Sequence, residues 1–130
     1  EVGTLSLQAD DPETVSSICA VLAETDVINM VSRGISSENI LKGIHLSMAG
    51  RLIKLLKAIK VRDSTVLVTG GLARDEGLCR ALKEQASDQK LAVQIRTHTD
   101  SIFAGAIGAA IWGEFRYRKL NQAEAAPLAA

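Results

Sequence analysis

Aromatic residues and net charge are both scarce in this sequence. The 130 residues include two Phe, one Trp and one Tyr, and all of them lie toward the C-terminal end, at Phe103, Trp112, Phe115 and Tyr117. Stacking platforms for bases or sugars are therefore absent from most of the chain. Because 15 Lys and Arg balance 15 Asp and Glu, there is also no basic excess of the kind that holds a phosphate backbone. We expect no nucleic acid among the partners.

Long apolar runs and targeting signals are missing as well. One of the longest charge-free runs, residues 101–113, is shorter than the roughly 20 apolar residues that cross a bilayer. Residues 1–13 are acidic and contain no basic segment followed by an apolar one, so they do not resemble a signal peptide. We therefore expect no membrane contact and a cytoplasmic location. Since the sequence also lacks an initiator Met, we expect a fragment of a longer chain.

Cysteine is rare, whereas apolar residues are plentiful. The two cysteines, Cys19 and Cys79, are far apart in a chain without secretory features, which argues against a disulfide framework. A hydrophobic fraction of 47% and a mean hydropathy of +0.14 exclude intrinsic disorder and provide for a buried core. The length suits one domain. We place that domain at residues 1–120 and expect residues 121–130 to form a disordered tail.

Hydrophobic patterning predicts an α/β domain with a mixed sheet flanked by helices. Alternation over residues 3–8 and a strand-forming run at 16–23, on either side of an Asp-Asp-Pro turn, predict a β-hairpin. Helical spacing predicts helices at residues 24–33, 36–60, 75–85 and 101–119, and further strands are predicted at 65–69 and 91–96. The charge-free strand at 65–69 is expected to be buried on both faces. The resulting order is ββααβαβα.

The strongest local signal is a strand that ends in a pair of glycines and turns into a helix, VLVTGGLARD at residues 66–75. Without side chains, Gly70 and Gly71 let the backbone approach a ligand at the carboxyl end of the sheet, where open α/β folds bind theirs, usually a nucleotide. The alternative is a tight turn that only needs positive φ. The spacing of a phosphate-binding P-loop is missing.

Other polar candidates are isolated along the chain. Cys19 is either an inert buried thiol or a cluster ligand, and because a [4Fe–4S] cluster normally needs four thiolates, this chain can supply only one of them. Cys79 is expected in the core or half-buried. His45 and His98 have no ligand-spaced neighbour and are expected at the surface. Asp100 is predicted to cap the final helix at its N-terminus and to lie near the glycine pair.

The long helix is expected to be amphipathic, with its polar face in solvent. That face carries Lys42, His45, Arg51, Lys54 and Lys57.

Three segments taken together resemble one family. SICAVLAETDVIN (17–29), STVLVTGGLARDEGL (64–78) and DSIFAGAIGAAIWG (100–113) are similar to the activator-type ATPases that drive benzoyl-CoA reductase and 2-hydroxyacyl-CoA dehydratases. The combination of a Cys before a [VL][FL]AE[TS][DE]V run, a TGG turn and an AGAIGAA helix is far more specific than any one piece. The resemblance covers nearly the whole chain and implies the C-terminal lobe of a ribonuclease H-like ATPase of the actin and sugar-kinase type.

In that family, each subunit gives two cysteines to one [4Fe–4S] cluster shared across a subunit interface. ATP hydrolysis lets an electron pass from reduced ferredoxin, through the cluster, to the partner that holds the acyl-CoA. The resemblance implies that Cys19 is the second of those cysteines. The first lies in a Cys-Ala-Ala-Gly-Thr-Gly segment that is absent from this sequence.

The resemblance also implies the nucleotide site. Gly70 and Gly71 match the turn that binds the adenosine of ATP, Lys42 lies on a helix that borders the adenine pocket, and Asp100 approaches the ribose or adenine. The phosphate-binding hairpin and the carboxylate that coordinates Mg²⁺ belong to the family's other lobe. We therefore expect these 130 residues to hydrolyse little or no ATP alone.

The ending IFAGAIGAAIWGEFRYRKL (102–120) is more similar to the benzoyl-CoA reductase ATPase subunits than to the dehydratase activators. The expected partners are a homologous ATPase subunit, the substrate-binding reductase subunits and reduced ferredoxin. Three alternatives stay open: a dehydratase activator, a kinase of the same superfamily, which would have no use for Cys19, and a non-catalytic scaffold. In the scaffold, the glycine pair would be only a turn and Cys19 only core.

Overall fold

The computed structural model describes residues 1–16 and 19–124, the last three by their backbone alone. The elements in chain order are α1 (Val2–Ser6), α2 (Ala20–Ser32), α3 (Ser37–Ala58), β1 (Ser64–Leu67), the 3₁₀ helix η1 (Gly71–Arg74), α4 (Glu76–Asp88), β2 (Val93–Arg96), the 3₁₀ helix η2 (Thr99–Phe103) and α5 (Ala104–Glu124). Within these residues, no helix is both long and apolar enough to cross a membrane.

Helix α3 is the central element, and its bounds follow from its sequence. The Ser36 hydroxyl accepts a hydrogen bond from the amide of Asn39 at 3.3 Å, Glu38 lies in the first turn and Lys57 in the last, as helix capping and the helix dipole favour. These features confirm the long helix predicted from spacing.

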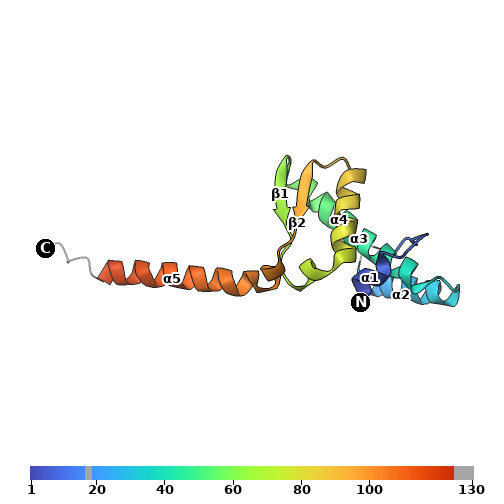
Figure 1. The fold of residues 1–130 in the computed structure, drawn as a ribbon, viewed down its shortest axis with the longest axis horizontal. Helices are drawn as coiled ribbons and strands as arrows, with labels where there is room; N and C mark the ends of the chain where they lie inside the picture. Colours follow the sequence, from blue (N-terminus) through green and yellow to red (C-terminus); the bar gives the residue numbers. More distant parts are fainter. Residues whose placement is uncertain (17–18, 125–130) are drawn as a thin grey trace.

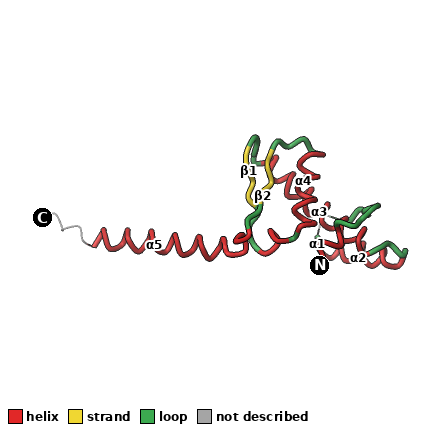
Figure 2. Tube along the Cα trace, viewed as in Figure 1, coloured by secondary structure: helices red, strands yellow, loops and turns green. Residues whose placement is uncertain are grey.

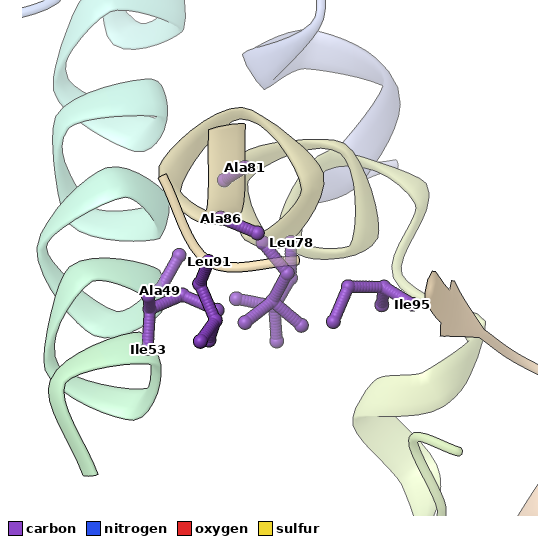
Figure 3. Packing of buried hydrophobic residues seen from close by; sticks show 8 residues of the cluster. Ala49, Ile53, Leu78, Ala81, Ala86, Leu91 and Ile95 are labelled. Atoms are coloured by element: carbon purple, nitrogen blue, oxygen red, sulfur yellow. The ribbon is translucent and has the colours of Figure 1, made fainter. Parts of the chain in front are cut away.

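The main core forms where α3 and α4 cross (Figure 3). Ala49 and Ile53 of α3 are fully buried against the apolar side of α4, and Leu91 and Ile95 close the cluster from the second strand and the residues before it. The members from α4 are Leu78, Ala81, Leu82 and Ala86. A smaller cluster of Val15, Met30 and Ile40 fixes α2 to the other end of α3.

The sheet has two parallel strands, joined by α4 (Figure 1). Ser64 pairs with Val93 and Leu67 with Arg96, so both strands end at the same edge, beside η1 and η2. The prediction that the first strand is buried on both faces is wrong, because three of its four residues are exposed. Val66, Val93 and Ile95 pack against the helical core, whereas the alternate residues of the two strands, Thr65, Leu67, Gln94 and Arg96, are exposed.

The predicted β-hairpin is wrong, and with it the mixed sheet, because the described strands pair only in parallel. Residues 2–6 form helix α1, and residues 20–23 are the first turn of α2, while residues 17–18 lie outside the described part. In this helix Gly3 and Ser6, one turn apart, face inward, whereas the apolar Leu5 and Leu7 of the alternating pattern are exposed. Tertiary packing against α3 and α4 overrides the local strand preference.

Helix α5 extends away from the rest of the molecule (Figures 1 and 2). Of the described elements, only η2 contacts it. Its large apolar side chains are exposed, among them Ile111 at 66% and Trp112 at 62%. The helix runs to Glu124, and the remainder of the predicted tail, residues 125–130, lies outside the described part.

Candidate functional site

The glycine turn has a backbone conformation that favours glycine, and it has open space beside it. Gly70 has φ 88° and ψ −175°, a region that residues with a side chain avoid. Its amide donates to the carbonyl of Ser101 at 2.8 Å, and its own carbonyl accepts from the amide of Ala73 at 3.2 Å. A Cβ on Gly70 or on Gly71 would meet nothing within 4 Å. The tight-turn prediction is therefore confirmed for Gly70, and the backbone on this side is also accessible to a ligand.

Asp100 lies next to this turn but does not cap a helix. It stands in the first turn of η2, one residue before Ser101, and its side chain is 63% exposed. The cap is His98, whose Nδ1 accepts from the amide of Asp100 at 3.1 Å while its own amide donates to Ser101 Oγ at 3.0 Å. The prediction that Asp100 is the N-cap is therefore wrong. The extended backbone of His98 places its imidazole, rather than the Asp100 carboxylate, at the N-terminus of η2. The expected surface position of His98 is confirmed.

Lys42 lies in a hollow of about 610 Å³ between α1, α3 and α4. It is not on a solvated face as predicted: its side chain is only 12% exposed, and Nζ pairs with Glu84 Oε2 at 2.5 Å. Arg80 pairs with the other oxygen of Glu84 at 3.2 Å. Across the helix, Arg51, Lys54 and Lys57 are exposed, which confirms the prediction for the second half of α3.

Two of the four predicted nucleotide residues, Lys42 and Gly71, line hollows, and each lines a different one. Gly71 lines a second hollow of about 400 Å³, and Arg74 and Glu76 line both hollows. Gly70 and Asp100 line neither. Sequence reasoning missed Arg74, Glu76, Arg80 and Lys83, although residues 76, 80 and 83 recur every three or four positions on one face of α4, which was a readable signal.

His45 is buried, and the surface prediction for it is wrong. Its side chain is 8% exposed, with Nε2 3.7 Å from Asp75 Oδ1 and Nδ1 2.9 Å from Ser6 Oγ. Burial lowers the pKa of His45, and Lys42 adds to this lowering, while the Asp75 carboxylate opposes it. The hydrophobic spacing of α3 could not reveal this, because the partners Ser6 and Asp75 come from distant parts of the chain.

The two cysteines lie in different surroundings. Cys19 is the N-cap of α2 and exposed, so the inert buried thiol is excluded, and so is the strand predicted to contain it. Cys79 is half-buried as predicted, with Sγ 3.6 Å from the carbonyl oxygen of Ala73. Burial, reinforced by Asp75, raises the pKa of the Cys79 thiol. Among the described residues, no three His, Cys, Asp or Glu side chains gather as a metal site would require.

Comparison with known proteins establishes the family of this chain. Residues 1–113 match the BadF/BadG/BcrA/BcrD ATPase family, and the chain belongs to it. It is 69% identical over 120 residues to the D-type subunit of benzoyl-CoA reductase from Thauera aromatica, an alignment that covers 92% of this chain and 43% of that protein. It is 36% identical over 124 residues to the 2-hydroxyisocaproyl-CoA dehydratase activator of Clostridioides difficile, covering 95% and 44%.

Solved structures carry the same fold. The activator of the 2-hydroxyisocaproyl-CoA dehydratase from Clostridium difficile with bound ADPNP matches with a TM-score of 0.79 and 33% identity, covering all of this chain and 46% of that one. Component A of the Acidaminococcus fermentans (R)-2-hydroxyglutaryl-CoA dehydratase matches with a TM-score of 0.75 and 33% identity, covering 85% and 40%. The actin and sugar-kinase type of fold is thereby confirmed. The chain spans less than half the length of these relatives.

Proposed function

We propose that this chain is the nucleotide-binding lobe of an ATPase subunit of benzoyl-CoA reductase, of the D type. The protein would couple ATP hydrolysis to the ferredoxin-driven reduction of the aromatic ring of benzoyl-CoA, as part of anaerobic degradation of aromatic compounds in the cytoplasm. The observation that carries the proposal is the 69% identity to a subunit of this type over 92% of the chain. The partners would be a homologous ATPase subunit, the substrate-binding subunits and reduced ferredoxin.

The nucleotide part of the proposal rests on the glycine turn. Its backbone is open on one side, and a relative solved with ADPNP covers the whole of this chain. In the proposed complex, Gly70 and Gly71 would border the adenosine of Mg²⁺-ATP, Lys42 would border the adenine from α3, and Asp100 would approach from η2. The lobe would therefore bind and orient the nucleotide, while the groups that act on the phosphates would come from the rest of the protein.

The proposed [4Fe–4S] cluster supplies one-electron transfer at low potential. Cys19 fits a shared cluster as one ligand, because its thiol is exposed and stands at the N-terminus of a 13-residue helix, an end that favours negative charge. Cys79 does not suit the role, since its Sγ is half-buried beside Ala73 at the start of α4. These 130 residues would thus contribute one thiolate, a segment of the protein outside them a second, and the homologous subunit the other two.

A test uses the complete reductase complex purified without oxygen. Cys19→Ser should lower the iron content and abolish the ATP-dependent consumption of benzoyl-CoA, whereas the matched variant Cys79→Ser should keep both. Normal iron content and normal visible absorption in the Cys19→Ser complex would rule out the ligand role.

A second candidate function is the activator of a 2-hydroxyacyl-CoA dehydratase. It is favoured by the solved structures, which are both dehydratase activators or components. Both candidates need Cys19, so the substrate distinguishes them: ATP-dependent turnover of a 2-hydroxyacyl-CoA, without turnover of benzoyl-CoA, would favour the activator. The exposed Cys19 argues against the scaffold alternative, which required this residue to be core.

A further inference from the structure

A buried polar cluster joins three helices directly behind the glycine turn. Ser6 of α1 is 1% exposed and His45 of α3 is 6% exposed, and Asp75 immediately precedes α4. The imidazole lies between the other two side chains, with Nδ1 2.9 Å from Ser6 Oγ and Nε2 3.7 Å from Asp75 Oδ1. The imidazole forms a hydrogen bond with Ser6 and lies in close polar contact with Asp75, at a distance longer than a hydrogen bond, so it packs together the segments that supply them.

Asp75 makes hydrogen bonds both to the glycine turn and to helix α4. Its carboxylate accepts from the amide of Leu78 at 2.8 Å and so caps α4, while its own amide donates to the carbonyl of Leu72 inside η1 at 3.0 Å. Asp75 therefore links the start of α4, through its side chain, to the turn of residues 70–74, through its backbone. His45 is the ionisable side chain of α3 that faces this carboxylate.

Two glycines make room for the cluster. A Cβ on Gly77 would lie 2.1 Å from Ser6 Oγ and 2.8 Å from His45 Nδ1, and a Cβ on Gly3 would lie 2.7 Å from Asp75 Oδ1. Contacts shorter than 3 Å cannot be absorbed without displacement of one partner. The helices thus approach as closely as their backbones allow, and the imidazole position is tightly defined.

The cluster contributes a residue to each of the two hollows beside the turn. Ser6 lines the larger hollow and Asp75 the smaller one, and Arg74, the last residue of η1, lines both. His45 lines neither hollow, so it can act on a ligand in them only through its neighbours Ser6 and Asp75.

We propose that His45 is a positioning residue for nucleotide binding, which packs against Asp75 and thereby keeps the turn of residues 70–74 in the shape that the nucleotide requires. The inference rests on the proposed function of this turn. A side chain that keeps a polar nitrogen at the place of Nε2 should preserve the effect, and one that keeps only the place of Nδ1 should not. Gln and Asn are the two substitutions to compare. The longer Gln places its amide near the position of Nε2, toward Asp75, and the shorter Asn places it near the position of Nδ1, toward Ser6.

The test measures the affinity of the complete ATPase protein for a fluorescent ADPNP derivative. His45→Asn is expected to weaken binding about tenfold, an effect in the range of coupled neighbouring residues, and His45→Gln is expected to bind within about twofold of the wild type. Hydrogen exchange of residues 70–78 should accelerate in the Asn variant and not in the Gln variant. Met30→Ala, in the separate core cluster of α2, controls for a general loss of stability and should leave ADPNP affinity unchanged.

Gly77→Ala gives an independent test should His45→Asn not fold, since its methyl group must displace the imidazole or Ser6. Weaker ADPNP binding and faster exchange of residues 70–78 are expected here as well. Wild-type affinity in a folded His45→Asn or Gly77→Ala protein would overturn the positioning role, and so would equal losses in the Asn, Gln and Met30→Ala variants. If the wild type itself does not bind ADPNP, the proposed function falls and this inference with it.

Discussion

At the scale of single residues, exposure separates the two thiols. Cys19 is exposed at the start of α2, whereas Cys79 is half-buried and its pKa is raised, first by burial and then by the Asp75 carboxylate. Because the thiolate is the reactive form, Cys19 should react with iodoacetamide at pH 7.5 about tenfold faster than Cys79. Peptide mass spectrometry over time measures both rates. Faster labelling of Cys79 would contradict the structure around it, and Cys19→Ser should remove the fast phase.

The buried imidazole predicts how stability depends on pH. Burial lowers the pKa of His45 from its usual 6.5, with Lys42 adding to the lowering and Asp75 opposing it, so the folded state disfavours the proton. The unfolded chain takes up that proton as pH falls below about 6.5. The free energy of unfolding should therefore decrease below this pH, by at most about 1.4 kcal/mol per pH unit for one proton, and stop decreasing beneath the lower pKa of the folded state.

Urea unfolding between pH 8 and pH 5 measures this dependence. His45→Gln should flatten the part of the curve just below pH 6.5. Curves of the same slope for the wild type and His45→Gln would show that His45 does not carry the dependence.

At the scale of elements, the two kinds of glycine predict substitutions of opposite sign. Gly70 has φ 88°, so Gly70→Ala should cost about 1–3 kcal/mol of stability through backbone strain. Gly113 lies inside α5 with nothing within 4 Å of an added Cβ, so Gly113→Ala should raise the helix content slightly, with a gain of about 0.5–1 kcal/mol in local helix stability. Urea unfolding tests the first and circular dichroism the second. A neutral Gly70→Ala would mean that another backbone conformation serves the turn equally well.

How much of each element could be predicted depended on where its stabilising contacts come from. Helices α3 and α4 have their own caps, Ser36 and Asp75, and long apolar stripes, so local sequence was sufficient. Residues 2–6 have no side-chain cap, and their helix depends on α3 and α4, which the local pattern does not reveal.

The residues of the candidate site also fall into two groups, those that local sequence predicts and those that it does not. The turn at Gly70 and Gly71 was predictable because strand, glycines and helix follow one another in the chain. The exposure of Cys19 and the burial of Lys42 and His45 were not, because each depends on segments brought together only by the fold. Asp100 was placed beside the turn correctly, although the capping role went to His98, two residues earlier.

At the scale of the whole molecule, α5 projects from the body: it packs against little of the body, and its apolar side chains are largely exposed. Only η2 touches it among the described elements, and three of its apolar side chains, Ile111, Trp112 and Phe115, are half or more exposed. The core that holds the body together consists of residues from α3, α4 and β2 with the segment before it. Since burial of apolar surface is the main source of stability, α5 should contribute little to the unfolding free energy of the body.

Removal of residues 104–130 from this 130-residue chain tests that separation. The truncated chain should lose helical signal in circular dichroism, because α5 is one of the two longest helices described, while its Tm should stay within about 4 °C, the shift that corresponds to about 1 kcal/mol in a domain of this size. A matched truncation from the other end, removing residues 1–6, takes away α1 and Ser6, which pack against α3 and α4, and should lower Tm by more. If deletion of α5 lowers Tm as much as deletion of α1, then α5 folds back onto the body in solution, and the apolar side chains of α5 are buried there.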